Sequence, residues 1–482
     1  MKELLTLFFI CALNLESIGQ ISGAGKTKEN VLSLQECIDA AIQNNLQIKQ
    51  NQLSVERGKL TLDESKYGLY PTLNGGTGLS LFSGRNINPF TNGIINSLVG
   101  QNNFNLQAGM ILYDGKRTRN TMLLNQQSLE AAGLDLQTIR NTISLQVAVA
   151  YLSVLSQEDL LIIAQKQAEV TQLQIDRTQK LVDAGALAET NLFDLKAQLA
   201  NDELQIVNSV NNLESAKLTM SQLLNYTDGR NFEVTRVLVP NPNVSNYPNS
   251  SQEIYNTAIS FLPEVKAAET RKKVAETGTE IAKSAKLPTL SANAGWGTAY
   301  TTAAERIITT TEIDKRTLGN VDINGTKFPL IIESPKTINE KISYPKQITT
   351  NMNSSVGVNL RIPIFNGYNA KYRLATAKIQ EDQADLQLQL VKLQLKQSID
   401  QAYIALSNAS KRYTATQSQV SSLEEAYRAA TVRFDAGSLN SVDYNIAKTN
   451  LDRAKANLVQ TKYDYVFRIK ILDFYQNKPL SF

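Results

Sequence analysis

The sequence has 482 residues and nearly balanced charge, with 49 Lys and Arg residues against 45 Asp and Glu residues. No basic cluster stands out, which argues against nucleic acid as a partner. The chain has no histidine, only two cysteines and no pattern typical of a hydrolase nucleophile, so nothing supports an enzyme, a cofactor or a metal site.

The N-terminus is typical of a secretory signal. Leu4 to Leu13 is apolar but far shorter than the roughly 20 residues that span a bilayer, and Ser17-Ile18-Gly19 has the small residues that a signal peptidase requires. We expect cleavage after Gly19. Lipidation of Cys11 is a less favoured alternative, because Ile10 is bulky for the preceding position. No later segment stays apolar for about 18 residues, so any membrane-spanning part is expected to be a β-barrel.

The first half of the chain predicts a helix followed by two strands. Ser33-x-x-Glu36 is a capping box, and it opens one predicted helix from Ser33 to Gly68, which ends before Tyr70-Pro71. Thr72 to Phe82 is a weak strand candidate, whereas Phe104 to Leu112 alternates apolar and polar residues cleanly. That period is typical of a strand with one apolar and one wet face. Ser83 to Asn103 is expected to be a polar loop between them.

Two long helical hairpins are predicted by the absence of helix breakers. From Lys116 to Asp228 there is no proline, and strong helix formers fill the run. Asp183-Ala184-Gly185 interrupts it. The same arrangement returns from Tyr368 to Asn477, interrupted by Asp435-Ala436-Gly437. Each glycine predicts a left-handed cap at which one helix ends and the chain reverses.

The two halves of the chain are an internal duplication. Motifs from the first half recur in the same order in the second: Leu34-Gln35-Glu36 as Ser251-Gln252-Glu253, Pro71-Thr72-Leu73 as Pro288-Thr289-Leu290, and Asp114-Gly115 as Asn366-Gly367. The second strand pair is expected at Leu290 to Tyr300 and at Val356 to Ile364. A longer polar segment between these strands, about Thr301 to Ser355, predicts a solvent-facing loop.

These patterns together predict an α+β protein with the following organisation. The signal peptide covers 1–19, a linker covers 229–250 and a tail covers 478–482. The first repeat, 20–228, contains a helix, a strand pair at 70–115 and a helical hairpin at 116–228 with its tip at 183–187. The second repeat, 251–477, contains a helix, a strand pair at 287–366 with an extracellular loop at 301–355, and a helical hairpin at 368–477 with its tip at 435–439.

Four amphipathic strands of about 10 residues suit a membrane barrel but cannot close one, because about eight strands are the practical minimum. Other copies of the chain must complete the edges. Two copies would give a filled barrel of eight strands, and three would give twelve strands and begin to leave a lumen. The alternate polar residues would line it, and two aromatic residues would suit an aromatic girdle. These are Asn105, Gln107, Asn359 and Arg361 for the lumen, and Trp296 and Tyr300 for the girdle. A small soluble sheet is the alternative, with Arg361 as a solvated charge.

The order of these motifs resembles the outer-membrane efflux (TolC) family over nearly the whole mature chain. The resemblance is carried by Leu34-Gln35-Glu36-x-x-Asp39-x-Ala41-x-x-Asn44-Asn45, by Tyr70-Pro71-Thr72-Leu73, by the Asp114-Gly115 and Asn366-Gly367 strand exits and by both Asp-Ala-Gly turns. It implies a homotrimer with a twelve-stranded outer-membrane barrel and a periplasmic tunnel of twelve helices. It also implies an export duct that serves an inner-membrane pump through a periplasmic adaptor, in a tripartite efflux or type I secretion system.

The resemblance further implies a closable end near the second hairpin tip, where carboxylates of three subunits form a ring. Asp443 matches one ring position, but Ile446 stands where the family has a second carboxylate. Phe434 replaces a family tyrosine, and Leu439 an arginine. In the first hairpin Thr190 matches a gate position and Asn191 replaces an aspartate, so we expect the second hairpin to be the one that moves.

Two further expectations concern the hairpin tips. Asp435 and Asp443 could instead cap and solvate helix ends. The contact residues for the adaptor are expected to be Gly185, Leu187, Gly437 and Leu439. The competing reading of the whole chain is a periplasmic coiled-coil scaffold or adaptor without a pore of its own.

Overall fold

The computed structural model describes residues 30–87, 93–96, 98–226, 232–236 and 247–479. The expected signal peptide, 1–19, lies outside these residues. The chain divides into two compact units, and each unit takes segments from both halves of the sequence. Unit 1 contains the chain up to Leu46, Arg140–Ser250 and Gln401–Phe482. Unit 2 contains Gln47–Ile139 and Ser251–Asp400.

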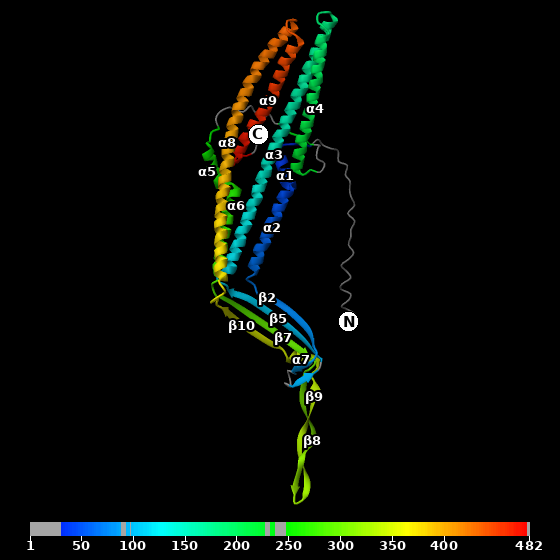
Figure 1. Ribbon diagram of the computed structural model, residues 1–482, viewed down its shortest axis with the longest axis vertical. Helices are drawn as coiled ribbons and strands as arrows, with labels where there is room; N and C mark the ends of the chain where they lie inside the picture. The colour runs from blue at the N-terminus through cyan, green and yellow to red at the C-terminus, as the bar shows by residue number, and fades with distance from the viewer. Residues whose placement is uncertain (1–29, 88–92, 97, 227–231, 237–246, 480–482) are drawn as a thin grey trace. The chain divides into compact units, whose positions relative to one another are not determined.

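The centre of unit 2 is an antiparallel sheet of four strands in the order β10-β7-β5-β2 (Figure 1). Its strands are β2 (Thr72–Phe82), β5 (Val99–Tyr113), β7 (Thr289–Thr301) and β10 (Asn353–Arg361). All four expected strands are therefore present and paired. The last strand lies three residues earlier than expected, because Pro363 has no N–H to donate and restricts the residue before it.

The prediction of a single helix from Ser33 to Gly68 is wrong in one respect, because the segment forms two consecutive helices. The capping box at Ser33 and Glu36 is present and starts α1 (Leu34–Asn44), after which Asn45 adopts an extended conformation and α2 (Leu46–Tyr67) begins. The second half repeats the break between α5 (Ser251–Phe261) and α6 (Pro263–Ser284). There the cause is plain in the sequence, since the residue before a proline avoids the helical region.

The segment 301–355, expected to be a loop, forms a long hairpin. β8 (Glu305–Ile323) and β9 (Thr326–Lys341) pair antiparallel, and the short helix α7 (Tyr344–Thr350) follows. Asn324 and Gly325 form the turn with positive φ angles of 53° and 83°. An Asn-Gly pair between two strands is a strong hairpin signal, and the sequence analysis overlooked it. The expected loop 83–103 likewise contains β3 (Arg85–Ile87) and β4 (Ile94–Asn96), and β5 begins within it.

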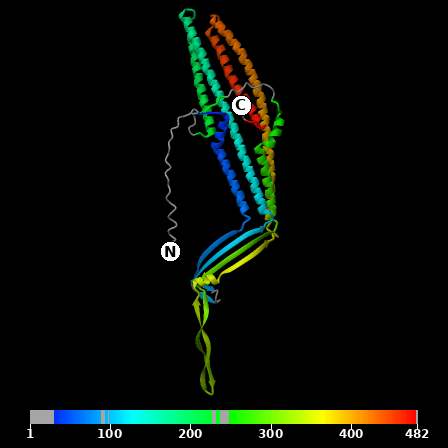
Figure 2. The same cartoon turned by 180° about the vertical axis from the view of Figure 1, so that it is seen from behind.

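Two long helical hairpins make up most of unit 1, and the first parts of their longer helices, before Arg140 in α3 and before Gln401 in α8, belong to unit 2. α3 (Arg117–Asp183) is followed by α4 (Thr190–Leu224), and α8 (Asn369–Asp435) by α9 (Ser441–Phe474). Figures 1 and 2 show α4 beside the end of α3 and α9 beside the end of α8. The expected linker, 229–250, contains a strand that the sequence did not indicate: β6 (Phe232–Val234) pairs in parallel with β1 (Asn30–Leu32).

Both hairpin turns have the predicted glycine caps. Gly185 has a φ of 73° and Gly437 a φ of 70°. The next residue in each turn donates its N–H five residues back, from Ala186 to the Leu181 carbonyl and from Ser438 to the Arg433 carbonyl. These bonds satisfy carbonyl groups that a helix end would otherwise leave free. The prediction of two left-handed helix ends is confirmed.

Cys37 is fully buried in α1, and burial raises the pKa of its thiol to about 12. The prediction that no helix after the signal is apolar enough to cross a membrane needs correction. α3 contains one stretch that is long and apolar enough by length and composition, but half of that stretch is buried inside the protein.

The duplicated glycines Gly115 and Gly367 allow a matched test of packing at the sheet's helical end. Both have a left-handed backbone, with φ values of 68° and 62°, so alanine should cost about 1–2 kcal/mol at either position. A Cβ at Gly115 would lie 2.7 Å from the Leu287 Cβ, whereas nothing lies within 4 Å of one at Gly367. Gly115→Ala should therefore cost about 1–3 kcal/mol more than Gly367→Ala in denaturant unfolding in detergent. Equal losses would contradict this packing.

Candidate functional site

The four-stranded sheet has one polar face, and its register decides which residues lie there. Asn105 is opposite Gly297, and Gly297 is opposite Asn353 on the next strand. Asn359 and Arg361 follow Asn353 at even spacing on β10, and Gln107 follows Asn105 on β5. Because residues two apart on a strand share a face, all four residues predicted to line a lumen lie on one side of the sheet.

Neutral amides cover glycines on this polar face. A Cβ at Gly78 would lie 2.6 Å from the Asn103 Oδ1, and one at Gly76 would lie 2.9 Å from the Asn105 Oδ1. Asn359 donates to Asn293 at 2.7 Å. The small residues therefore make room for amide side chains, and the face offers hydrogen-bond donors and acceptors with few charges.

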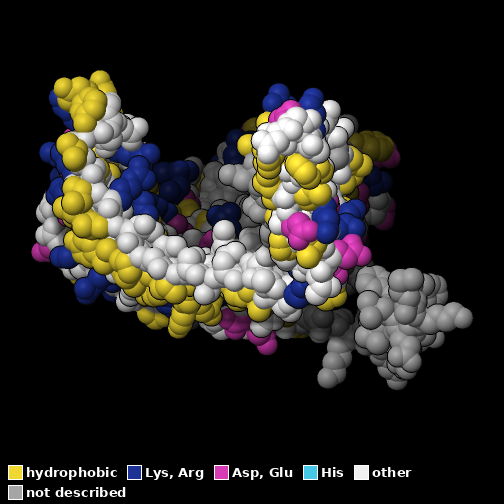
Figure 3. Space-filling model, turned by 90° about the horizontal axis from the view of Figure 1, so that it is seen from below, with side chains coloured by type: hydrophobic (Ala, Val, Ile, Leu, Met, Phe, Trp, Pro, Cys, Tyr) yellow, Lys and Arg dark blue, Asp and Glu magenta, His cyan; other side chains and the backbone are white. Residues whose placement is uncertain are grey.

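The other face of the sheet is apolar and open. Leu79 is 74% exposed and Val356 is 86% exposed. Figure 3 shows a band of apolar side chains along one side of the molecule, with polar and basic side chains beside it. Trp296 lies opposite Leu106 on this face, and the Tyr300 ring packs 4.7 Å from that of Tyr344 at the end of β7. Both predicted girdle residues therefore belong to the apolar face.

A second group of aromatic residues, which was not predicted from the sequence, lies at the opposite, helical end of the sheet. These side chains flank the strand ends and are exposed; they are Tyr67, Tyr70, Tyr113, Phe365 and Tyr368. Their signal was available, since each lies within a few residues of a strand–helix junction. Aromatic side chains at both ends of an apolar strand surface are the pattern of a membrane interface.

Near the hairpin turns, one apolar cluster joins all four long helices. Phe434 is 4% exposed, and its ring stacks on Tyr444 at 4.8 Å. Ile175 of α3 and Leu192 and Leu195 of α4 complete the cluster, and Leu439 packs against it. Phe434, which replaces the family's tyrosine, therefore packs between the two hairpins of one chain.

The two acidic gate candidates have different surroundings. Asp435 forms an ion pair with Arg177 of α3 at 2.7 Å, so it links the two hairpins rather than only capping a helix. Asp443 is exposed in the first turn of α9, where its N–H donates to the Asn440 side chain at 2.8 Å. Its carboxylate accepts from the same asparagine at 3.0 Å. Asn440 rather than Asp443 is therefore the N-cap of α9, and the Asp443 carboxylate lies exposed in the first turn of the helix.

The remaining predicted residues do not gather into one site. Ile446 is 54% exposed on α9, and Thr190 is exposed as the first residue of α4. Asn191 is half-buried. The docking candidates Gly185 and Gly437 are exposed at the turns, with Leu187 half-buried.

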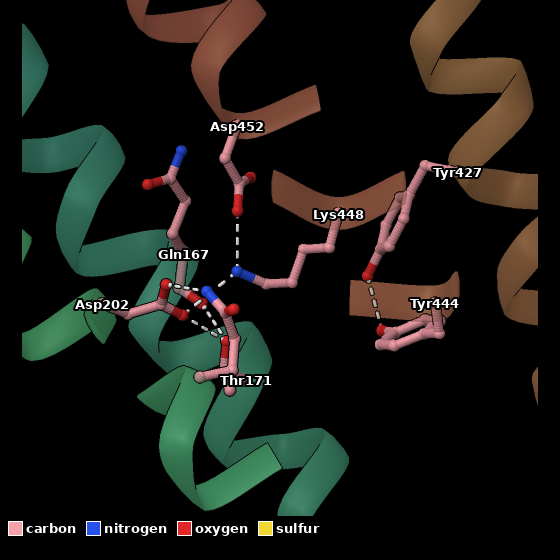
Figure 4. A network of polar contacts seen from close by, with 8 residues as sticks. Gln167, Thr171, Asp202, Tyr427, Tyr444, Lys448 and Asp452 are labelled. Atoms are coloured by element: carbon pink, nitrogen blue, oxygen red, sulfur yellow. Dashed lines mark hydrogen bonds and ion pairs between the residues drawn. The ribbon is translucent and has the colours of Figure 1, made fainter. Parts of the chain in front are cut away.

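The structure brings together a buried polar network that the sequence analysis did not identify (Figure 4). The Lys448 Nζ lies 3.1 Å from Asp202 of α4 and 2.7 Å from Asp452 of its own helix. The Lys448 side chain is only 3% exposed. The Thr171 hydroxyl of α3 donates to Asp202, so three helices meet at one charge cluster.

This network has an electrostatic cost as well as a structural role. Burial raises the pKa of the Asp452 carboxyl above its usual range; Lys448 opposes this and Asp202 adds to it. A sequence signal existed, because Tyr444, Lys448 and Leu451 share one helical face and both neighbours are apolar. A lysine on such a face must be paired when it is buried.

The network lies across the two hairpins of one chain. Asp202 belongs to the first hairpin and Lys448 to the second, and the Ser441 hydroxyl also donates to Asp194 across the same boundary. Together with the apolar cluster, these contacts hold α4 against α9. Any opening movement of the second hairpin alone would have to break them. Among the described residues no group of three His, Cys, Asp or Glu side chains is arranged to hold a metal ion.

Comparison with known proteins gives a consistent result. A family model described as outer membrane efflux protein matches residues 37–226 and 254–468. The chain is 22% identical over 368 residues to outer membrane protein TolC of Escherichia coli, covering 75% of this chain and 66%, just under two thirds, of that protein. It is 19% identical to outer membrane efflux protein BepC of Brucella suis, covering 96% of this chain and 89% of that one.

A solved structure shares the fold. The outer membrane protein VceC from Vibrio cholerae matches with a TM-score of 0.71 at 14% identity, covering 92% of this chain and 96% of that one. The expected fold class, long helical hairpins joined to a β domain, is confirmed.

Removal of the buried lysine should be far more damaging than removal of an exposed one on the same helix. Lys448→Met leaves Asp202 and Asp452 without their cation, which should cost about 3–5 kcal/mol of unfolding free energy. Lys455→Met breaks an exposed pair with Glu424 and should cost less than about 1 kcal/mol. Denaturant unfolding followed by circular dichroism measures both. Similar losses in the two variants would show that the network does not hold the helices together.

Proposed function

This chain belongs to the outer membrane efflux protein family, and on that premise we propose that three copies form an export channel across the outer membrane. The proposal rests above all on the sheet of β2, β5, β7 and β10. It exposes an apolar face, and in the described part of the chain each of its edge strands pairs on one side only. Such a sheet needs an apolar medium for its face and partner strands for its edges.

Copies of the same chain can supply those partners. β2 and β10 are the two edges and run in opposite directions, so β10 of one copy can pair antiparallel with β2 of the next. This head-to-tail contact closes into a ring. Three copies give twelve strands and leave a lumen, which the face containing Asn105, Gln107, Asn359 and Arg361 would line, whereas two copies would fill with side chains.

The helices extend this channel into the periplasm in our proposal, with the signal peptide 1–19 directing export of the chain. The hairpin turns at Gly185 and Gly437 would contact a periplasmic adaptor that connects to an inner-membrane pump of a tripartite efflux or type I secretion system. Asp443, exposed on α9, would contribute to a ring of carboxylates at the closed end. The channel would act in transport rather than catalysis. A scaffold without a pore would leave the open apolar sheet face unexplained.

The oligomeric state tests the central proposal. Because a closed barrel with a lumen needs three copies, the detergent-extracted protein should come from the outer-membrane fraction and size as a trimer in light scattering coupled to gel filtration. A folded monomer, or recovery in the soluble periplasmic fraction, would refute it. Reconstituted protein should also conduct ions across a planar bilayer.

The adaptor contact is tested at the second turn. Gly437→Trp should abolish most export by the assembled system while trimers remain in the membrane, because the bulky side chain blocks the docking surface. Gly325→Trp is a matched control, since both glycines have positive φ and open space around them. Its turn lies on the β8–β9 hairpin and should leave export unchanged. Equal export by the two variants would remove the turn from the docking surface.

A further inference from the structure

A pocket at the helical end of the polar sheet face has a concentrated positive charge. It has a volume of about 760 Å³ and lies between the ends of the strands, the end of α6 and the starts of α3 and α8. Three arginines line it: Arg117, Arg361 and Arg373. Asp114 is the only acidic residue among its described lining residues, so the pocket is strongly basic.

The pocket opens on the face that is proposed to line the lumen. Arg361 is opposite Thr289 in the register of β10 and β7, and both residues line the pocket. Ser291, two residues further along β7, also lines it. A solute moving along this face would therefore meet the arginines where the sheet gives way to the helices.

The duplication shows why the charge is concentrated at Arg361 and Arg373. In the first repeat Asp114 caps α3 by accepting from the Thr118 N–H at 2.9 Å, and it lies 3.7 Å from the Arg117 Nε. Asn366 has the equivalent position in the second repeat and caps α8 at the Ala370 N–H. A neutral amide thus replaces the carboxylate. Neither Arg361 nor Arg373 has a salt-bridge partner in the part of the chain that the structure describes.

We propose that Arg361 and Arg373 form an anion-binding site for solutes in transit through the channel, an inference that rests on the proposed function. The ligand is the carboxylate, phosphate or sulfate group of an anionic solute. Guanidinium groups bind such oxyanions through two parallel hydrogen bonds. The N-terminus of α8 adds its partial positive charge on the same side. In a trimer the site repeats three times around the lumen.

Conductance of the full-length trimer in phosphatidylcholine bilayers tests the site, with citrate as the probe anion. Reversal potentials in a potassium chloride gradient should give a chloride preference that falls at least about twofold in Arg361→Gln/Arg373→Gln, because the local anion concentration falls. The citrate concentration that halves the current should rise about tenfold, because two charge-assisted contacts are lost. Lys327→Gln/Lys346→Gln removes two positive charges outside the pocket and should change neither value.

A second variant keeps both arginines and restores the acid of the first repeat. Asn366→Asp should lower the chloride preference and weaken the citrate block, while α8 keeps a good cap. Channels that open normally, with selectivity and block unchanged in both pocket variants, would overturn the inference and leave the channel proposal intact. An effect that appears only when anionic lipid is added would assign the site to lipid headgroups and also overturn it. Wild-type protein that never conducts would instead refute the proposed function.

Discussion

A sheet of four strands that leaves one apolar face uncovered and both edges unpaired tends to associate with other strands and apolar surfaces in water. This constraint governs the rest of the molecule. The apolar face consists of side chains such as Leu79 and Val356 that no other part of the described chain covers. The polar face needs small residues, because its amides fold down onto glycines of the neighbouring strands. The same alternation of side chains along each strand therefore gives the sheet one apolar and one polar face.

The duplication is most informative where its two copies differ. Both strand–helix junctions use a glycine with positive φ, but Gly115 packs tightly against Leu287 and Gly367 is open. Both long helices begin with a side-chain cap, but one cap is a carboxylate and the other an amide. The common backbone requirement thus stays the same in both repeats, while the charge and packing around it differ. Such differences are where a duplicated channel can acquire selectivity without a change of fold.

The sequence could predict the features that depend on local rules. Helix-breaking residues predict the glycine caps at Gly185 and Gly437. Alternation of apolar and polar residues along the strands predicts the four strands and the shared face of Asn105 and Arg361. Even the run Leu386 to Leu395, which alternates like a strand, is helical within α8 because no breaker interrupts it. The Asn-Gly turn of the β8–β9 hairpin was equally readable and was overlooked.

What the sequence could not supply are pairings between distant segments. β1 and β6 are three residues each, too short for a periodic signal, and Lys448 finds Asp202 only when two hairpins pack together. Phe434 could be placed at a family position, but its burial among four helices required the structure. No proline follows Asn45, so the sequence does not indicate that the helix breaks there.

The division of the chain into units also sets an order on folding. Unit 2 is complete once Asp400 is available, whereas unit 1 needs Gln401–Phe482 as well as segments near the N-terminus. Contacts between segments so far apart in sequence carry a large loop-closure entropy and form late. A chain that is made from its N-terminus can therefore assemble its strands while the helical unit still lacks its last helix, α9. Until α9 is present, Asp202 lacks Lys448 and the apolar residues of α4 lack Tyr444, so the first hairpin exposes a surface that a chaperone can bind.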